Sequence, residues 1–437
     1  MILYGGEVVS SSEQDRLLDG LEARINRTLA RDRLPAETVI RALDILGQRA
    51  ATGEFDGLLR EHGVDGSDAL AAQVRGAAGL LSRPYLTYRL ETELGRDFFL
   101  PRTGRAFAGS GTVQTVPMPL GTLFHISAGN MDFLPAYTVA EGLLTGNVNL
   151  LKLPKADNGL TLLVLRTLTD IEPALRDYLY VFDTPSDDLA AMRKMAALAD
   201  GIVVWGGDAA VSAARAMAAP GAKLIEWGHR LGFAYLTAVW RENPDALEAL
   251  ADHLIRTEQL LCSACQVIYL DTDSMEEVRG FCRAFLPVLQ AARDRRPVTE
   301  IGAVAEMTLR NYNDGLERIL SGGAREDNEF RGRGCALSAR EDSRLELSDL
   351  FGRVPVKRLP RDAMMTVLRE KKGVLQTAGL LCGADERHAL TERLLRCGVN
   401  RVTLPGEMSD YFAGESHDGE YPLRRYVRMA NVSVSLL

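Results

Sequence analysis

The stretch Leu123-Phe124-His125-Ile126-Ser127-Ala128-Gly129-Asn130 joins an apolar run to a short polar turn. An apolar run of this length, bounded by turn residues, predicts a buried β-strand. Strand-like and helix-like segments alternate from here to residue 226. The further predicted strands are 148–152, 178–182, 202–205 and 223–226. The predicted helices are 133–144, 160–175, a helix that Ser186-Asp187-Asp188 caps and that runs to residue 198, and 209–218. This alternation is typical of a parallel sheet covered by helices on both faces.

The flanking sequence predicts two large lobes, because 437 residues exceed the usual size of one core. Residues 11 to about 95 show helical spacing of apolar side chains. We expect this helical region and a cofactor-binding domain over 1–231, and a domain that carries the nucleophile over 232–400. We expect the last segment, 401–437, to return to the cofactor domain or to form an oligomer interface.

Composition restricts the class of protein. A net charge of −8 argues against a nucleic-acid surface. The first six residues lack the basic start of a signal peptide, and no apolar run is long enough to span a bilayer. The six cysteines are scattered, which favours a reduced, cytoplasmic setting. Only seven of the 51 basic residues are lysine, and this skew suggests a bacterial source.

Cys262 is the strongest candidate for chemistry. It lies in Gln259-Leu260-Leu261-Cys262-Ser263-Ala264-Cys265, between a predicted helix over 245–261 and a predicted strand over 267–270. A cysteine thiolate is a nucleophile, and a free thiol titrates near ~8.5. The CxxC spacing with Cys265 leaves a dithiol, a zinc site or two inert buried thiols as alternatives. A zinc site would need a second cysteine pair, so we expect no metal.

Three further turns offer ligand contacts. Asn130 places an amide at the carboxyl edge of the predicted sheet, although a plain turn would also explain it. Lys152 ends a strand and can reach a ribose or a phosphate, or simply be solvated. The paired glycines Gly206 and Gly207 let backbone approach a pyrophosphate, or form an ordinary tight turn. The GxGxxG fingerprint is absent from the first turn.

Taken together, these motifs resemble the aldehyde dehydrogenase superfamily, and more closely its bioluminescence-type (LuxC-like) acyl-CoA reductases. The resemblance rests on an ordered set of segments. These are similar to the Pro-x-Asn turn with the Gly-Asn-x-x-x-x-Lys strand, the Trp-Gly-Gly turn, the Gln-x-x-Cys-Ser segment, the Glu-x-Phe-Gly segment and the C-terminal end. In this chain they are Ile126–Asn130 with Leu144–Lys152, Trp205–Asp208, Gln259–Ser263, Asp349–Gly352 and His417–Arg428.

The resemblance implies an α/β fold of two Rossmann-type lobes with the active site between them. It makes Cys262 the nucleophile and Asn130 an oxyanion donor, and it puts Glu226 at the position of the general base of aldehyde-oxidising members. The implied cofactor contacts are Ser127, Lys152, Trp205, Gly206, Gly207, Asp349 and Phe351. This chain departs from the pattern in having Asp349 for Glu and Cys265 within the nucleophile segment. It also continues Glu226 as Trp-Gly-His-Arg rather than Leu-Gly-Gly-Lys.

The implied activity is NADPH-dependent reduction of an acyl thioester, on coenzyme A or a carrier, to an aldehyde through a thioacyl enzyme on Cys262. NADH is the alternative cofactor. An oxidising aldehyde dehydrogenase, with Glu226 as its base, is an alternative enzyme, and a non-catalytic partner subunit is an alternative of another class. By analogy with the superfamily we expect a homo-oligomer, a dimer or a tetramer.

Overall fold

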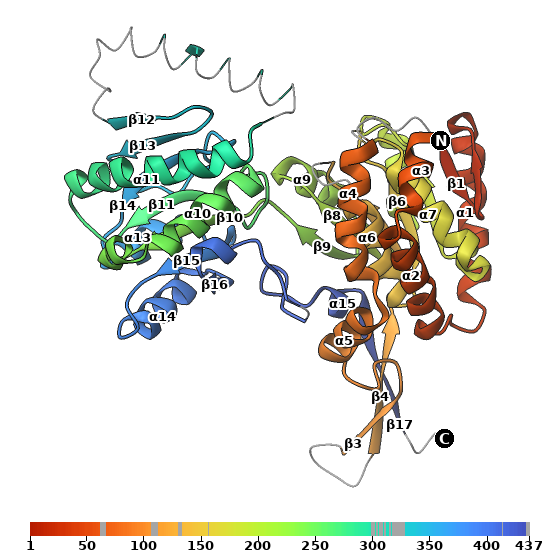
Figure 1. The fold of residues 1–437 in the computed structure, drawn as a ribbon. Helices are drawn as coiled ribbons and strands as arrows, with labels where there is room; N and C mark the ends of the chain where they lie inside the picture. The colour runs from red at the N-terminus through yellow and green to blue at the C-terminus, as the bar shows by residue number, and fades with distance from the viewer. Residues whose placement is uncertain are drawn as a thin grey trace. The chain divides into compact units, whose positions relative to one another are not determined.

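The computed structural model describes residues 1–61, 67–105, 112–129, 133–155, 157–298, 328–412 and 414–433, with positions 302, 305, 309, 312, 313 and 316. It divides into unit 1, Met1–Gly228 with Phe412–Leu437, and unit 2, His229–Tyr411 (Figure 1). The boundaries expected from the sequence lay at 231 and 400. Each unit is described by itself below.

Among the described residues, five α-helices lie between residues 14 and 94 of unit 1, where the apolar spacing predicted a helical region. They are α1 (Gln14–Leu29), α2 (Ala36–Ala51), α3 (Glu54–Glu61), α4 (Ser67–Ala77) and α5 (Arg83–Leu94). A feature that the sequence analysis missed precedes them: β1 (Ile2–Tyr4) and β2 (Glu7–Val9) form a hairpin. Gly5 and Gly6, both at positive φ, make its two-residue turn, which favours glycine for that reason.

The sheet of unit 1 has the order β2-β1-β7-β6-β5-β8-β9 and is parallel from β7 to β9. Its parallel strands are β5 (Thr122–Ile126), β6 (Val148–Lys152), β7 (Leu179–Phe182), β8 (Gly201–Trp205) and β9 (Lys223–Trp227). The connecting helices are α6 (Leu134–Leu144), α7 (Leu160–Ile171), α8 (Leu189–Ala197) and α9 (Asp208–Met217). The chain runs outward from β5 in both directions, so β5 and β8 flank a topological switch point, where ligands of such sheets bind.

The C-terminal segment of the chain packs on unit 1. After α15 (Pro422–Arg425), β17 (Val427–Ser433) pairs with β4 (Thr112–Pro119), which also pairs with β3 (Arg102–Arg105). Tyr426 is fully buried, and its carbonyl accepts a hydrogen bond from the Asn147 side chain at 3.1 Å. These contacts join the end of the chain to the loop before β6.

Unit 2 contains a second sheet of order β12-β13-β14-β11-β10-β15-β16, in which only the β12–β13 pair is antiparallel. The strands are β10 (Leu231–Leu236), β11 (Cys265–Leu270), β12 (Glu329–Arg331), β13 (Ala336–Arg340), β14 (Arg353–Arg358), β15 (Leu375–Leu381) and β16 (Arg401–Thr403). The helices are α10 (Pro244–Thr257), α11 (Met275–Arg295), α13 (Met364–Arg369) and α14 (Arg387–Cys397).

Side chains of β10 alternate between two apolar clusters, as a strand buried on both faces requires. Ala234 and Leu236 belong to the cluster that includes α10 and α11. Phe233 and Tyr235 belong to the cluster that includes α13 and α14. The helices therefore cover both faces of this sheet, as Figure 1 shows for α10, α11 and α14.

Two predicted helix ends were wrong. The helix expected over 160–175 ends at Ile171, because the residue before Pro173 is driven out of the helical region. The helix expected over 245–261 ends at Thr257. Glu258 and Gln259 follow with φ of 47° and 61°, in the left-handed region that cannot continue a helix. Cys262 lies between a helix and a strand, as the sequence predicted, but the turn that carries it begins earlier, at Glu258.

Candidate active site

The turn Glu258–Ala264 connects α10 to β11. It carries the predicted nucleophile Cys262, and we call it the nucleophile turn. The Ala264 N–H donates to the carbonyl of Leu261 at 3.0 Å and closes a tight turn around Cys262. The Cys262 side chain is exposed. The turn lies close against β10, because a Cβ on Gly232 would lie 2.7 Å from the carbonyl oxygen of Ala264. Only glycine at this position lets the two backbones come so near.

Cys265 differs sharply from Cys262. Its thiol is fully buried, and burial raises its pKa to about 12. Its Sγ donates to the carbonyl of Val267 at 3.3 Å. Its N–H donates to Nε2 of His253 at 3.3 Å, and burial lowers the pKa of this histidine to about 4, so the ring is neutral and can accept. A thiol in this state is a poor nucleophile, since the thiolate is the reactive form.

Hydrogen bonds join the nucleophile turn to the segment Asp349–Gly352. The Phe351 N–H donates to the carbonyl of Glu258 at 3.1 Å, and the Gly352 N–H donates to the side-chain oxygen of Gln259 at 3.0 Å. Leu350 and Phe351 have φ of 60° and 50°, which costs free energy in residues other than glycine. Left-handed residues thus occur on both sides of this contact.

Arg293 of α11 holds both loops together. Its guanidinium makes two hydrogen bonds to the Glu258 carboxylate, at 2.6 and 2.7 Å, and one to the carbonyl of Phe351 at 3.0 Å. The arginine side chain is only 3% exposed. A buried arginine paired in this bidentate way fixes geometry as well as charge. Sequence analysis missed Arg293, because nothing in the pattern of α11 marks it.

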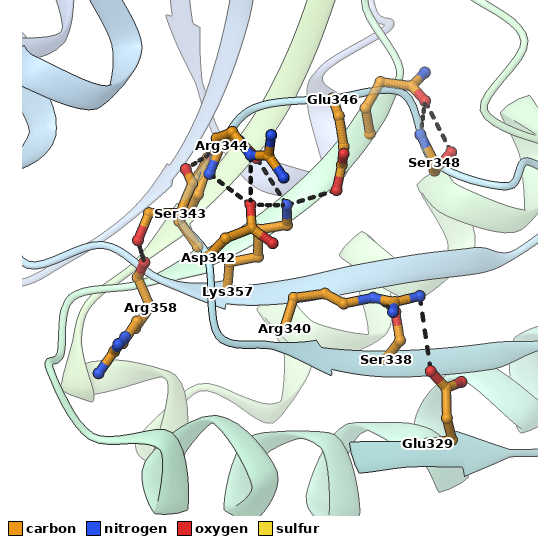
Figure 2. A network of polar contacts seen from close by, with 12 residues as sticks. Glu329, Ser338, Arg340, Asp342, Ser343, Arg344, Glu346, Ser348, Lys357 and Arg358 are labelled. Carbon is orange, nitrogen blue, oxygen red and sulfur yellow. Dashed lines mark hydrogen bonds and ion pairs between the residues drawn. The ribbon is translucent and has the colours of Figure 1, made fainter. Parts of the chain in front are cut away.

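Asp349 itself is exposed. Hydrogen bonds from Lys357 anchor the segment 342–346 that leads to it (Figure 2). Lys357 of β14 has no exposed side-chain surface and donates to Asp342 at 2.9 Å, Glu346 at 2.6 Å and the carbonyl of Arg344 at 2.8 Å. Burial alone would raise the pKa of Asp342, but its hydrogen bonds, chiefly to Lys357, lower the pKa below its ordinary value. The Asp349 loop is therefore positioned by a charge cluster around the buried ammonium group of Lys357.

In unit 1 the predicted cofactor contacts lie at one edge of the sheet. Ser127 follows β5, Lys152 ends β6, and Trp205 ends β8, all at the carboxyl ends of neighbouring strands. Gly207 is the N-cap of α9, and a Cβ placed on it would meet nothing within 4 Å. Gly207 thus leaves open space in front of a helix N-terminus, where backbone N–H groups favour an anion.

Two polar groups at this edge suit a ligand. The Ser127 side chain is buried, and its Oγ finds no hydrogen-bond partner among the residues that the structure describes. Lys152 is 4% exposed, and burial lowers its pKa. Its Nζ donates to Ser186 Oγ at 2.8 Å, and no carboxylate pairs with it within the described part of the chain. A hydroxyl-rich, anionic group such as a nucleotide fits these donors. Asn130 lies outside the described residues.

Glu226 of β9 is held in an ion pair. Arg215 donates to both of its carboxylate oxygens, at 2.5 and 2.6 Å, and this hydrogen bonding lowers the pKa of Glu226. A carboxylate in an ion pair is a weaker base than a free one, because protonation would abolish its attraction to the arginine.

His417 completes an aromatic cluster beside the glycine turn. Its ring lies 5.3 Å from that of Trp205 and 5.0 Å from that of Trp227, and the two indoles stack at 5.4 Å. His417 begins the C-terminal segment that carried part of the resemblance. The cluster is one of the contacts by which that segment packs on unit 1.

The fold is that of the aldehyde dehydrogenases. The chain is similar to the lactaldehyde dehydrogenase of Escherichia coli, with a TM-score of 0.65 and 17% identity over 98% of this chain and 92% of that chain. It is also similar to the glyceraldehyde-3-phosphate dehydrogenase GapN of Methanocaldococcus jannaschii complexed with NADP, with a TM-score of 0.70 and 14% identity over 98% and 95% of the two chains. The fold class expected from the sequence is confirmed.

The family is equally clear. The model of the acyl-CoA reductase (LuxC) family matches residues 36–429, so the chain belongs to this family of oxidoreductases, as its motifs predicted. It is similar to the long-chain acyl-protein thioester reductase of Aliivibrio fischeri, with 20% identity over 77% of this chain and 67% of the relative. It is also similar to the long-chain acyl-protein thioester reductase 2 of Photobacterium leiognathi, with 25% identity. That match spans 38% of this chain and about a third (35%) of the relative.

None of the helices that the structure describes combines the length and the apolar character that a membrane crossing needs.

Proposed function

We propose that the protein reduces an acyl thioester to an aldehyde through a thioacyl intermediate on Cys262, with NADPH as the reductant. The observation that carries this proposal is the exposed Cys262 thiol in a turn bound to the Asp349–Gly352 segment, in a chain of the acyl-CoA reductase family. Cys265 is the wrong thiol for the reaction because it is buried and its pKa is raised to about 12.

In the first step the Cys262 thiolate attacks the carbonyl carbon of the thioester. A carbon–sulfur bond forms, and the carbonyl π electrons move to oxygen. Collapse of this adduct breaks the bond to the carrier sulfur, and the carrier leaves as a thiolate that takes up a proton. The second step places a hydride on the thioacyl carbon. Breaking the bond to Sγ then releases the aldehyde and restores the Cys262 thiolate.

Groups of the chain stabilise the negative charge that develops in these steps. We propose that the Cys262 N–H and the Asn130 amide bind the oxyanion, where loss of one donor typically costs about 10²–10³ in rate. Glu226 is not needed for this chemistry, because no water is activated. Its ion pair with Arg215 favours reduction over the oxidising alternative, which requires a free base.

A nicotinamide cofactor would supply the hydride. We propose that its pyrophosphate lies at Gly206 and Gly207 and that Ser127 and Lys152 donate to the adenosine ribose or a phosphate on it. The buried Ser127 Oγ and the Lys152 ammonium support this assignment. Asp349 and Phe351 are proposed contacts to the other ribose. The resemblance supports NADPH rather than NADH, and the GapN structure, which has the same fold, is complexed with NADP.

The relatives' names extend the proposal to the substrate. They are called long-chain acyl-protein thioester reductases, so we propose a long-chain acyl group carried by coenzyme A, a carrier protein or a partner enzyme. We also propose a cytoplasmic homo-oligomer, as expected from the scattered cysteines and from the superfamily.

The test is NADPH oxidation with acyl-CoAs and acyl-protein thioesters, with the product identified as aldehyde or acid. Cys262→Ala should abolish both turnover and the thioacyl adduct seen by mass spectrometry, whereas Cys265→Ala should keep both. Oxidation of an aldehyde to an acid with NAD⁺ or NADP⁺, lost in Glu226→Gln, would instead establish the oxidising alternative. A chain that binds neither NADPH nor NADH would support the non-catalytic subunit.

A further inference from the structure

Gln376 contacts the sulfur of Cys262. Its side-chain Nε2 lies 3.3 Å from Sγ and donates to it. The glutamine belongs to β15 and is 4% exposed, whereas the thiol is exposed. The pair is separated by 114 residues in sequence, so the fold of unit 2 creates the contact.

An irregularity in the sheet directs Gln376 toward the turn. Leu231 and Phe233 of β10 pair with Leu375 and Ala378 of β15, so Gln376 and Thr377 together oppose the single residue Gly232. A bulge of this kind turns a side chain away from the regular alternation and is common beside active sites. Gly232 is also the residue whose missing side chain admits the nucleophile turn.

The same level of the sheet is irregular on the other side of β10. Gly232 and Phe233 pair with Cys265 and Val267 of β11, which leaves Gln266 as the extra residue. Gln266 donates to the carbonyl of Gln259 at 2.8 Å and so supports the nucleophile turn. Both bulges therefore place a glutamine against this turn.

The backbone beneath Gln376 is fixed. The Asn400 N–H donates to the Gln376 carbonyl at 3.0 Å, and the Asn400 side chain donates to the Leu375 carbonyl at 3.3 Å. A donor whose backbone is pinned in this way needs little reorganisation when charge develops on its acceptor.

We infer that Gln376 is a thiolate-stabilising residue, which holds Cys262 in its anionic form before attack. The inference rests on the proposed role of Cys262 as the nucleophile. An amide N–H bound to sulfur favours the charged form of the thiol. Glutamine does not titrate and cannot take the proton itself. Gln376 therefore sets how much thiolate is present and leaves proton transfer to other groups.

The test is the rate at which iodoacetamide alkylates Cys262, measured over the pH range in which the thiol titrates. Gln376→Met keeps the length of the side chain and removes the donor. The midpoint of the pH profile should rise by about one pH unit, and thiol nucleophilicity rises with basicity with a slope of about 0.4–0.5. Alkylation should then be about threefold slower below the midpoint and about threefold faster on the alkaline plateau.

The two profiles should therefore cross, which a merely structural loss would not produce. Thr377→Val is the matched control, because it removes a neighbouring buried polar group that makes no hydrogen bond to Cys262 within the described structure. Its profile should overlie that of the wild type. Peptide mass spectrometry assigns the adduct, with Cys262→Ala as the blank.

Alkylation requires neither substrate nor cofactor, so the two proposals fail separately. Crossing profiles in a protein that reduces no thioester would support the role of Gln376 and overturn the proposed function. Thioester reduction with profiles that superimpose, or that differ by one constant factor at every pH, would overturn the inference about Gln376 alone. A midpoint that falls in Gln376→Met would overturn it as well.

Discussion

The two units build their sites at opposite edges of their sheets. In unit 1 the predicted cofactor contacts lie at the carboxyl ends of β5, β6 and β8, where α9 begins. In unit 2 the nucleophile turn lies at the amino end of β11, where α10 ends. A helix that begins offers free N–H groups to an anion, whereas a helix that ends offers carbonyl groups, which repel one.

This difference explains how each site is made. At its glycine turn unit 1 needs only small residues, because the start of α9 already supplies backbone donors beside Gly206 and Gly207. Unit 2 must bring donors from elsewhere, and it does so with Arg293 and Gln376. We therefore expect changes at the unit 2 site to affect stability and activity together, and changes at the unit 1 site to affect ligand binding alone.

The largest expected effect is at Arg293. Arg293→Met leaves the Glu258 carboxylate without its bidentate partner and frees the Phe351 carbonyl. Breaking a buried ion pair typically costs about 3–5 kcal/mol, and we expect the lower end here, because Glu258 is 24% exposed. Denaturant titration should show the loss of unfolding free energy. Thioacylation of Cys262 should also be slower in this variant. Arg295→Met, on the same helix in an exposed pair with Asp252, should cost about 1 kcal/mol or less.

Acid should destabilise both units through one histidine each. Burial lowers the pKa of His125 in unit 1 and of His253 in unit 2 from 6.5 to about 4. As the pH falls, these histidines bind protons in the unfolded chain before they do so in the folded one. Their contribution to the free energy of unfolding is therefore fully present above pH 6.5 and is lost as the pH drops toward 4. The loss by pH 4 is about 3 kcal/mol per histidine. Denaturant titrations should show a smaller loss in His125→Gln and in His253→Gln; an unchanged loss would contradict the assignment.

A smaller effect is expected at Gly232. In Gly232→Ala the new methyl group would overlap the carbonyls of Ser263 and Ala264, at 2.8 and 2.7 Å, and displace the nucleophile turn. We expect a loss of about 1–3 kcal/mol in unfolding free energy and slower alkylation of Cys262. Gly280→Ala in α11 is the control. A Cβ there meets nothing within 4 Å, so the change should stabilise by about 0.5–1 kcal/mol.

The smallest effect on stability is expected at Gly207. The space in front of this residue is open, so Gly207→Ala should leave the unfolding free energy within about 0.5 kcal/mol of the wild type. A pyrophosphate bound there would meet the methyl group. NADPH affinity, measured by calorimetry, should fall about tenfold, which is about 1.4 kcal/mol. If affinity does not change, the pyrophosphate does not lie at this turn.

The sequence predicted the parts of the molecule that depend on local pattern. Apolar periodicity is a local property, so the strands from β5 to β9 and the helices between them were predictable. Cys262 stood out because its neighbours in sequence form the motif. The hairpin of β1 and β2 was missed, although Gly5-Gly6 between short apolar runs is a hairpin signal.

The sequence did not predict what depends on contacts between distant segments. Gln376 and Arg293 reach the nucleophile turn from other strands and helices, so no spacing reveals them. The left-handed conformation of Glu258, Gln259 and Phe351 could not be predicted from the sequence. Residues other than glycine rarely adopt it, and none of these side chains is typical of it. The Glu226 position was visible, but its partner Arg215 was not, because that pair joins a helix to the following strand.

The aromatic cluster gives the molecule a built-in optical label. The chain has three tryptophans, and two of them, Trp205 and Trp227, stack on each other beside the glycine turn of unit 1. The third, Trp240, packs edge-on against Phe281 in unit 2. The intrinsic fluorescence of the protein therefore divides between the two units. Emission from the stacked pair senses the surroundings of Gly206 and Gly207, and emission from Trp240 serves as an internal reference in the same molecule.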